Sequence, residues 1–214
     1  MILGPVEACW HIDHYQGPLR KVLDIGAYVS ALSIEAARRG AQTVYAFEPN
    51  PETFEQLQRN ILEARFGHII EPLNVAVMTG EGSVMMNGHG PCFTAMIDVE
   101  GAEKQALPCV SFKDILRRGP VDYVKCDIEG AEFQTFDLSE ELAECLQNVR
   151  FLEVEIHRIG QCPCHNYVAT DDDGRREELI VWLQSVGFDD PPCGVRQIHP
   201  GAFCSFNRNF VGVK

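Results

Sequence analysis

Short apolar runs alternate with longer amphipathic segments along most of the chain. The short runs are rich in β-branched and aromatic residues, which indicates strands, whereas the longer segments place apolar side chains at helical spacing. The expected strands are residues 21–25, 43–47, 68–73, 121–126 and 149–156, and the expected helices are residues 29–39, 51–64, 130–145 and 177–186. Gly40 and Gly187 follow two of these helices as stop signals, and Pro51 suits the first turn of another.

This β-α-β-α alternation predicts an α/β fold with a mostly parallel sheet and helices on both faces. Two further short strands at residues 203–206 and 209–213 would complete a seven-stranded sheet as an antiparallel hairpin at one edge. A separate short pair is expected around residues 82–87 and 108–110. The length fits a single domain over residues 1–214, with an N-terminal extension at 1–19 and a candidate lid loop at 158–174.

The charge balance excludes several kinds of partner. Lys and Arg number 18 against 31 Asp and Glu, a formal net charge of −13, so the chain lacks the basic surface that nucleic acid or an anionic membrane requires. No signal peptide precedes the first strand, and the nine cysteines are an odd number, so we expect reduced thiols in a cytoplasmic protein, a monomer or a homodimer. Ten of the acids lie between residues 121 and 155, which suggests that much of the charge belongs to a site.

Ligands of open parallel sheets bind beyond the carboxyl ends of the strands. That rule places the turn from Asp24 to Ser30 and the segment Glu48-Pro-Asn-Pro at the mouth of a site. A carboxylate at the end of the second strand suits the two hydroxyls of a ribose, so the pattern predicts a ligand that carries a nucleoside.

The turn after the first strand favours S-adenosylmethionine over NAD. A dinucleotide needs a glycine-dense turn for its pyrophosphate, whereas this turn has Gly26 alone, with Tyr28 and Ser30 where further glycines would help. Asp24 would repel a phosphate but would favour a ligand with a sulfonium and an ammonium group. A purely structural acid that caps the next helix is the alternative.

Five sequence blocks resemble the FkbM family of methyltransferases. They are Val22-Leu-Asp-Ile-Gly-Ala27, Tyr45-Ala-Phe-Glu-Pro-Asn-Pro51, Asn60, Asn74-Val-Ala-Val77 and Val124-Lys-Cys-Asp-Ile-Glu-Gly-Ala-Glu132. The resemblance covers about residues 20–157 and implies a Rossmann-like class I methyltransferase fold. It further implies methylation of a hydroxyl on a small molecule or glycan with S-adenosylmethionine. The expected cofactor-binding residues are Asp24, Gly26, Ala27, Ser30, Glu48, Pro49, Asn50, Asn74, Val75, Ala76 and Asp127.

A hydroxyl acceptor must lose its proton, so a base is expected near the transferred methyl group. Asp127 and His157 follow two adjacent strands and are the candidates, with Glu129 and Glu132 to orient the acceptor. The alternative is that carboxylates in the first turn of a helix serve only its dipole. No metal is expected, although the carboxylates of Asp127, Glu129 and Glu155 are ligands that a divalent cation could bridge.

Weaker features compete with this interpretation. Cys162, Cys164 and His165, with partners scattered through the tail, could bind zinc, but free thiols fit the spacing better. Two other functions remain open from sequence: an NAD-dependent oxidoreductase on a similar fold, and a non-catalytic cofactor-binding protein.

Overall fold

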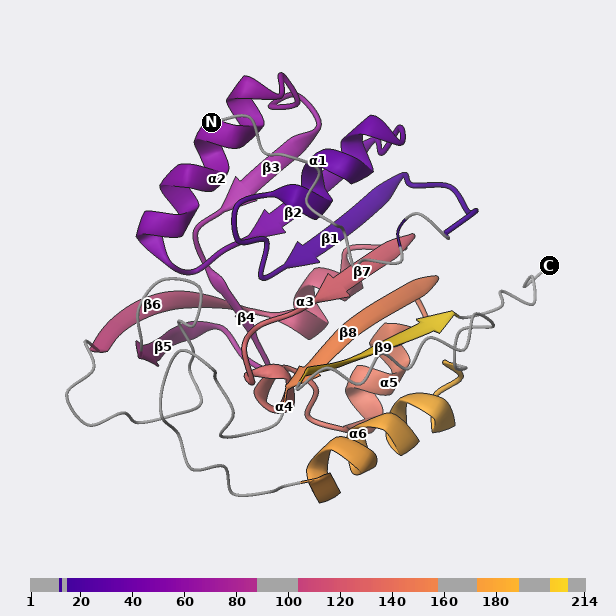
Figure 1. Cartoon of the computed structure of the whole chain (residues 1–214). Coiled ribbons are helices and arrows are strands. Elements are labelled where there is room, and N and C mark those ends of the chain that lie inside the picture. The colour runs from indigo at the N-terminus through magenta and orange to yellow at the C-terminus, as the bar shows by residue number, and fades with distance from the viewer. Residues whose placement is uncertain (1–11, 13–14, 88–103, 158–172, 189–200, 208–214) are drawn as a thin grey trace.

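The expected sheet is present in the computed structural model, which describes residue 12 and residues 15–87, 104–157, 173–188 and 201–207. In the described part of the chain this sheet has six strands (Figure 1). In spatial order they are β3 (Ile70–Leu73), β2 (Thr43–Phe47), β1 (Lys21–Ile25), β7 (Tyr123–Cys126), β8 (Phe151–His157) and β9 (Gly201–Asn207). Neighbouring strands are parallel except β8 and β9, which are antiparallel. The parallel sheet and its antiparallel edge are confirmed, while the strand expected at 209–213 lies outside the described residues.

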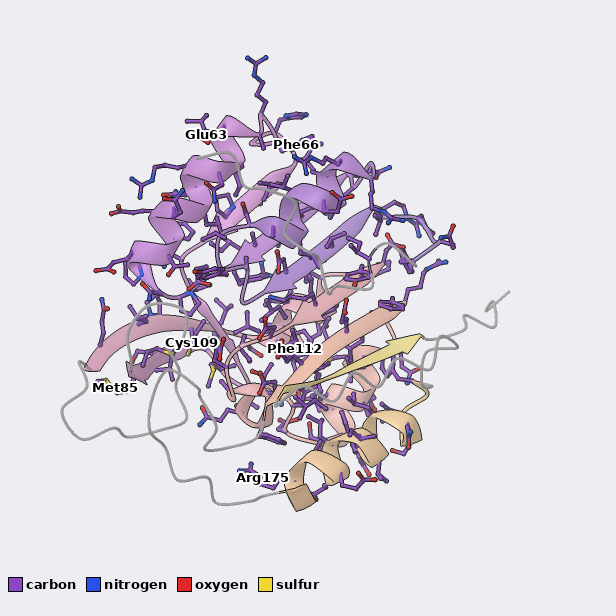
Figure 2. The ribbon with its side chains drawn as sticks, viewed as in Figure 1. Glu63, Phe66, Met85, Cys109, Phe112 and Arg175 are labelled. Carbon is purple, nitrogen blue, oxygen red and sulfur yellow. The ribbon has the colours of Figure 1, made fainter. Side chains whose placement is uncertain are left out.

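Helices cover both faces of this sheet, because successive strand residues point to opposite sides. On one face Val22, Val44 and Ala46 pack against α1 (Ala31–Arg38) and α2 (Pro51–Glu63). The other face is covered by α3 (Phe112–Arg117), α5 (Glu140–Leu146) and α6 (Asp173–Ser185). Figure 2 shows Phe112 in the interior of this second layer, where its side chain is fully buried.

The helix expected over residues 130–145 is wrong as one element. The structure has a short α4 (Glu132–Thr135) and then α5, separated by a turn in which Leu138 has a φ of 53°. The Ser139 side chain accepts a hydrogen bond from the N–H of Leu142 and thereby caps a new helix. Asp137 accepts hydrogen bonds from the N–H and hydroxyl of Ser139, which holds the turn. The Asp-Leu-Ser run is therefore a capping signal.

A second, smaller sheet lies beside the first. It consists of β4 (Ala76–Met78), β6 (Lys104–Ser111) and β5 (Gly82–Asn87), in that order. A pair of strands was expected here, and the structure shows β5 and β6 to be antiparallel, whereas β4 was not expected. The short α3 was also unexpected, and the Ser111 side chain caps it by accepting from the N–H of Asp114.

The two ends of the expected domain are described only in part. Tyr15 packs its ring edge-on against Tyr123, at 5.6 Å between centroids, so part of the N-terminal extension belongs to the core. The lid loop ends earlier than expected, because Asp173 and Gly174 already belong to α6, and residues 158–172 lie outside the described residues. The longest described helices, α2 and α6, have 13 residues each, and none of the described helices could cross a membrane.

Candidate functional site

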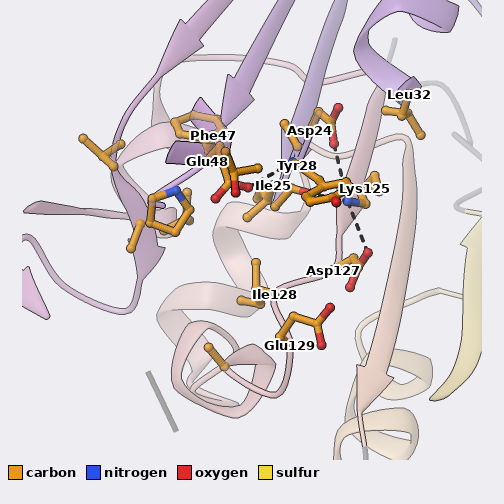
Figure 3. A pocket seen from close by; sticks show the side chains of 18 of the residues that line it. Asp24, Ile25, Tyr28, Leu32, Phe47, Glu48, Lys125, Asp127, Ile128 and Glu129 are labelled. Carbon is orange, nitrogen blue, oxygen red and sulfur yellow. Dashed lines mark hydrogen bonds and ion pairs between the residues drawn. The ribbon is translucent and has the colours of Figure 1, made fainter. Parts of the chain in front are cut away.

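A cavity of about 640 Å³ opens at the carboxyl ends of β1, β2 and β7. That volume lies within the range of roughly 300–1,000 Å³ that is usual for ligand pockets. Most of its lining comes from four segments: the turn after β1, the end of β2, strand β4 and the turn after β7. The start of α1, the first turn of α2 and strand β5 also contribute to it. Figure 3 shows how the charged side chains of these segments are arranged around it.

Gly26 fixes the turn at the bottom of the cavity. Its φ is 77°, and a Cβ at this position would lie 1.7 Å from the carbonyl oxygen of Asp127. The N–H groups of Gly26 and Ala27 both donate to the carbonyl of Phe47, at 3.0 and 2.9 Å. Only glycine permits this close approach of backbones, so β1, β2 and β7 end together at the site.

Two residues of the same turn adopt a left-handed conformation without being glycine. Tyr28 has a φ of 49° and lines the cavity, whereas Ser30 has a φ of 78° and does not line it. Ser30 occupies the N-cap position of α1, but its side chain makes no capping hydrogen bond. Its hydroxyl is buried with no hydrogen-bond partner in the protein. The structure thus places Ser30, an expected cofactor residue, behind the cavity wall.

Glu48 is a buried hydrogen-bond acceptor on the cavity wall. One carboxylate oxygen accepts from the N–H of Tyr28 at 3.0 Å, and the other accepts from the N–H of Asn50 at 2.9 Å. Burial raises the pKa of Glu48 to about 7, although these two hydrogen bonds oppose the shift. Each oxygen keeps acceptor capacity for a ligand hydroxyl.

Of the other expected cofactor-binding residues, some line the cavity and others support its wall. Pro49, Val75 and Ala76 line the cavity. Asn74 instead donates its amide to the carbonyls of Glu48 and Pro49, at 2.8 and 3.0 Å, and so holds the end of β2. Asn50 is likewise a support, because its side chain caps α2.

Lys125 is the residue that the sequence analysis did not single out. Its ammonium lies 3.6 Å from Asp24 and 3.5 Å from Asp127, and it donates to the carbonyl of Gly26. Burial by itself lowers the pKa of Lys125, but the two carboxylates outweigh it and the pKa is raised, so the group is an ammonium at neutral pH. A lone lysine within the apolar strand β7 was the available signal.

The ion pair between Lys125 and Asp24 changes the role that is assigned to Asp24. This carboxylate is fully buried and accepts a hydrogen bond from the Ser33 hydroxyl at 2.6 Å. It lines the cavity, but its charge acts together with that of Lys125. Asp24 therefore helps to fix the floor of the cavity.

The turn after β7 brings Asp127 and Glu129 to the cavity. Both line it, and Glu129 has a φ of 56°. Glu132 does not line it; its carboxylate accepts from the N–H groups of Ile128 and Gly130, at 3.1 and 3.3 Å. Glu132 thus stabilises the turn after β7 through the backbone N–H groups of that turn, which is the role of a structural acid in the first turn of a helix.

The structure relates the candidate residues of β8 to the cavity less directly than those of the turn after β7. His157 is the last residue of β8, beyond Val154, which pairs with Cys126 at the end of β7. The side chain of His157 is not among those that the structure describes. Glu153 is fully buried and accepts a hydrogen bond from the Tyr123 hydroxyl. The expected zinc candidates Cys162, Cys164 and His165 lie outside the described residues. Within the described ranges, no three His, Cys, Asp or Glu side chains are grouped to hold a metal ion.

The acid-rich stretch from residue 121 to 155 is mostly structural. Of its ten acids only Asp127 and Glu129 line the cavity. Asp122 lies at the opposite end of β7, where it pairs with Arg20 at 3.2 Å and Arg150 at 3.6 Å. The expectation that this stretch concentrates charge at the site is therefore wrong for most of its acids, because a parallel strand exposes its two ends at opposite edges of the sheet.

The cavity as a whole combines an apolar wall with a negative floor. In the described part of the chain its charged lining is Asp24, Glu48, Asp127 and Glu129 against Lys125. Aliphatic and thioether side chains form the remainder of the wall around β4: Val75, Ala76, Val77, Met78 and Met86. This combination suits a ligand with a flat apolar group, hydroxyls and a positive charge.

Comparisons with known proteins agree with this chemistry. A family model described as "Methyltransferase FkbM domain" matches residues 24–189. The "Hexuronic acid methyltransferase AglP" of Haloferax volcanii is 28% identical over 168 residues, which cover 71% of this chain and 67% of that protein.

Two solved structures show the same fold. The "Methyltransferase FkbM" from Methylobacillus flagellatus KT has a TM-score of 0.55 at 16% identity, over 87% of this chain and 43% of that chain. An uncharacterized protein from Listeria monocytogenes serotype 4b has a TM-score of 0.51 at 15% identity, over 94% of this chain and 66% of that one. The chain thus spans less than half of the Methylobacillus protein.

Proposed function

The chain belongs to the FkbM methyltransferase domain family, and from this premise we propose that it transfers a methyl group from S-adenosylmethionine to a hydroxyl of a small molecule or sugar. The cavity is the observation that carries the proposal, because it offers the buried carboxylates of Asp24 and Glu48, an apolar wall and a net negative charge at the strand ends. The relative named for hexuronic acid supports a sugar as the acceptor.

The residues present fit S-adenosylmethionine. Glu48 would accept hydrogen bonds from the ribose hydroxyls, and Val75 and Ala76 would lie along the adenine. Asp24 and Asp127 provide negative charge that exceeds the single charge of Lys125 between them. When bound, this cofactor supplies an electrophilic methyl group on a sulfonium.

The protein's own contribution is to align the acceptor and receive its proton. Asp127 is the proposed base, because its carboxylate lines the cavity and is 20% exposed. Glu129, on the same turn, would accept a hydrogen bond from the acceptor. His157 remains the alternative base, since it ends the strand that pairs with β7, on the cavity side of the sheet.

Two rival functions predict different binding. An NAD-dependent oxidoreductase would need space and donors for a pyrophosphate, yet the turn from Gly26 to Ser30 faces Asp24 and Asp127. A non-catalytic protein would bind S-adenosylmethionine without turnover.

Calorimetric titration with S-adenosylmethionine and with NAD tests whether the protein is a methyltransferase or an NAD-dependent oxidoreductase. We expect heat with the former alone, and weaker binding in Glu48→Ala. Binding of NAD in place of S-adenosylmethionine would refute the proposal.

Methylation assays on an accepted hydroxyl compound test whether the protein is an enzyme or a non-catalytic binder of S-adenosylmethionine. Asp127→Asn is expected to lower kcat by about 10²–10⁴-fold, the usual contribution of general base catalysis. His157→Ala tests the alternative base, and Glu63→Gln, on the exposed end of α2, is a matched control for the loss of one charge. Full turnover in both Asp127→Asn and His157→Ala would refute the base assignment.

A further inference from the structure

Tyr28 is an unusual wall residue of the cavity. Its side chain is 48% exposed, and it is the one aromatic residue among the exposed large hydrophobic side chains in the described part of the chain. It also lines the cavity, which the other three of that group, Leu62, Met85 and Val181, do not. An exposed aromatic face at a cavity mouth is available to a ligand.

The backbone holds this ring in place. Tyr28 has a φ of 49°, a conformation that bulky residues rarely adopt, and its N–H donates to Glu48. Figure 3 draws the ring between Glu48 and Lys125, with Asp127 and Glu129 below it. Strained residues that persist are characteristic of functional sites, so the position of the ring points to a role.

The neighbours of Tyr28 define what the ring can bind. Asp127 and Glu129 line the same cavity, and each carboxylate offers about four acceptor positions. An apolar face beside carboxylate acceptors is complementary to a sugar ring, which has C–H faces and hydroxyl edges. It is unfavourable for an acceptor that carries its own carboxylate, because Asp127 and Glu129 line this part of the cavity and the ammonium of Lys125 is already paired with Asp24 and Asp127.

We infer that the acceptor is a neutral sugar ring that packs on Tyr28 and donates its hydroxyls to Asp127 and Glu129, and that uronic acids are disfavoured. This inference rests on the proposed methyltransferase function and extends it to the substrate class. It also separates this chain from the relative that is named for hexuronic acid.

The probes are methyl β-D-glucopyranoside and methyl β-D-glucuronide, whose rings differ only in a hydroxymethyl or carboxylate group. Saturation-transfer NMR titrations measure their Kd on protein saturated with S-adenosylhomocysteine. We expect the glucoside to bind about tenfold more tightly, since like charges several ångströms apart near a protein surface repel by more than the equivalent energy.

Variants of Tyr28 and Glu129 separate the contribution of the aromatic ring to sugar binding from that of the carboxylate charge. Tyr28→Leu, which keeps the backbone strain, should weaken glucoside binding about fivefold, whereas Tyr28→Phe should change it less than about twofold. Glu129→Gln should reduce the ratio of the glucuronide Kd to the glucoside Kd, because it removes one negative charge from the cavity. Glu63→Gln, at the far end of α2, should leave the preference unchanged (Figure 2).

Three outcomes would overturn the inference: glucuronide binding as tight as that of the glucoside, no effect of Tyr28→Leu, or no binding of either sugar. In each case calorimetry with S-adenosylmethionine, on the same protein before S-adenosylhomocysteine is added, distinguishes failure of this inference from failure of the proposed function. Intact cofactor binding leaves the proposed function standing, whereas its loss refutes that function instead.

Discussion

Ser30→Gly is expected to stabilise the protein, against the usual effect of mutations in a buried turn. Ser30 has a φ of 78°, is fully buried, and has a hydroxyl without a hydrogen-bond partner in the protein. Glycine adopts this backbone conformation without a Cβ clash and carries no hydroxyl. The substitution therefore removes two unfavourable features at one position.

The magnitude follows from four contributions. Relief of the left-handed conformation is worth about 1–2 kcal/mol, and removal of a buried unsatisfied hydroxyl about 1–3 kcal/mol. The greater unfolded-state entropy of glycine opposes these by roughly 0.5–1 kcal/mol, and the lost burial of one methylene opposes them by about 0.8 kcal/mol. We expect a net gain of about 2 kcal/mol, the centre of these ranges, which raises the Tm of a chain of this size by about 4–8 °C.

Urea unfolding of three variants tests each contribution separately. Ser30→Ala keeps the backbone strain and removes the hydroxyl, so it should gain less than Ser30→Gly. Arg65→Gly is the matched backbone control, because Arg65 has a φ of 62° and an exposed side chain. The Kd for S-adenosylmethionine should stay within about twofold in Ser30→Gly, since Ser30 lies off the cavity. A destabilised Ser30→Gly, or equal gains from the alanine and glycine variants, would refute the reasoning.

Three further predictions concern the cavity itself. Because folding raises the pKa of Glu48 from 4.5 to about 7, the folded state binds an extra proton between these values, so stability should fall as pH rises through this window. Over the same window the affinity for S-adenosylmethionine should rise, and Glu48→Gln should remove both trends in denaturation and calorimetry at several pH values. Lys125→Met should lower the free energy of unfolding by about 3–5 kcal/mol in urea titrations, because it leaves a buried carboxylate without its cation; an unchanged midpoint would contradict this. Gly26→Ala should abolish cofactor binding in calorimetry, because its Cβ would lie 1.7 Å from the Asp127 carbonyl, whereas Gly80→Ala, with open space around it, is the control that should bind normally.

Much of the fold followed from local pattern. The strand at Thr43–Phe47 and the helix from Pro51 were expected within a residue, because apolar periodicity, a capping asparagine and an N-terminal proline all agree there. The single helix over 130–145 failed because its apolar pattern continues across the Asp-Leu-Ser turn, where capping hydrogen bonds outweigh periodicity. Strand β4 was missed because three residues carry too little pattern.

The candidate site was predicted less evenly. Strand-end acids such as Glu48 and Asp127 were found because topology alone brings strand ends together. Asn74 and Ser30 belong to the same motifs but point elsewhere, since a motif fixes the backbone path and the direction of each side chain depends on packing. Lys125 was overlooked although a lone lysine in an apolar strand is a signal, because its carboxylate partners are identified only in the folded structure.

The sequence by itself determined the order of elements, the mostly parallel sheet and the turn that begins at Gly26, because these depend on periodicity and local backbone preference. Only the tertiary structure decided which charges meet. Asp122 and Asp127 are five residues apart and flank the two ends of β7, yet one pairs with Arg20 and Arg150 and the other lines the cavity with Lys125. A charge acts over a few ångströms through space, and the distance along the chain does not specify that separation.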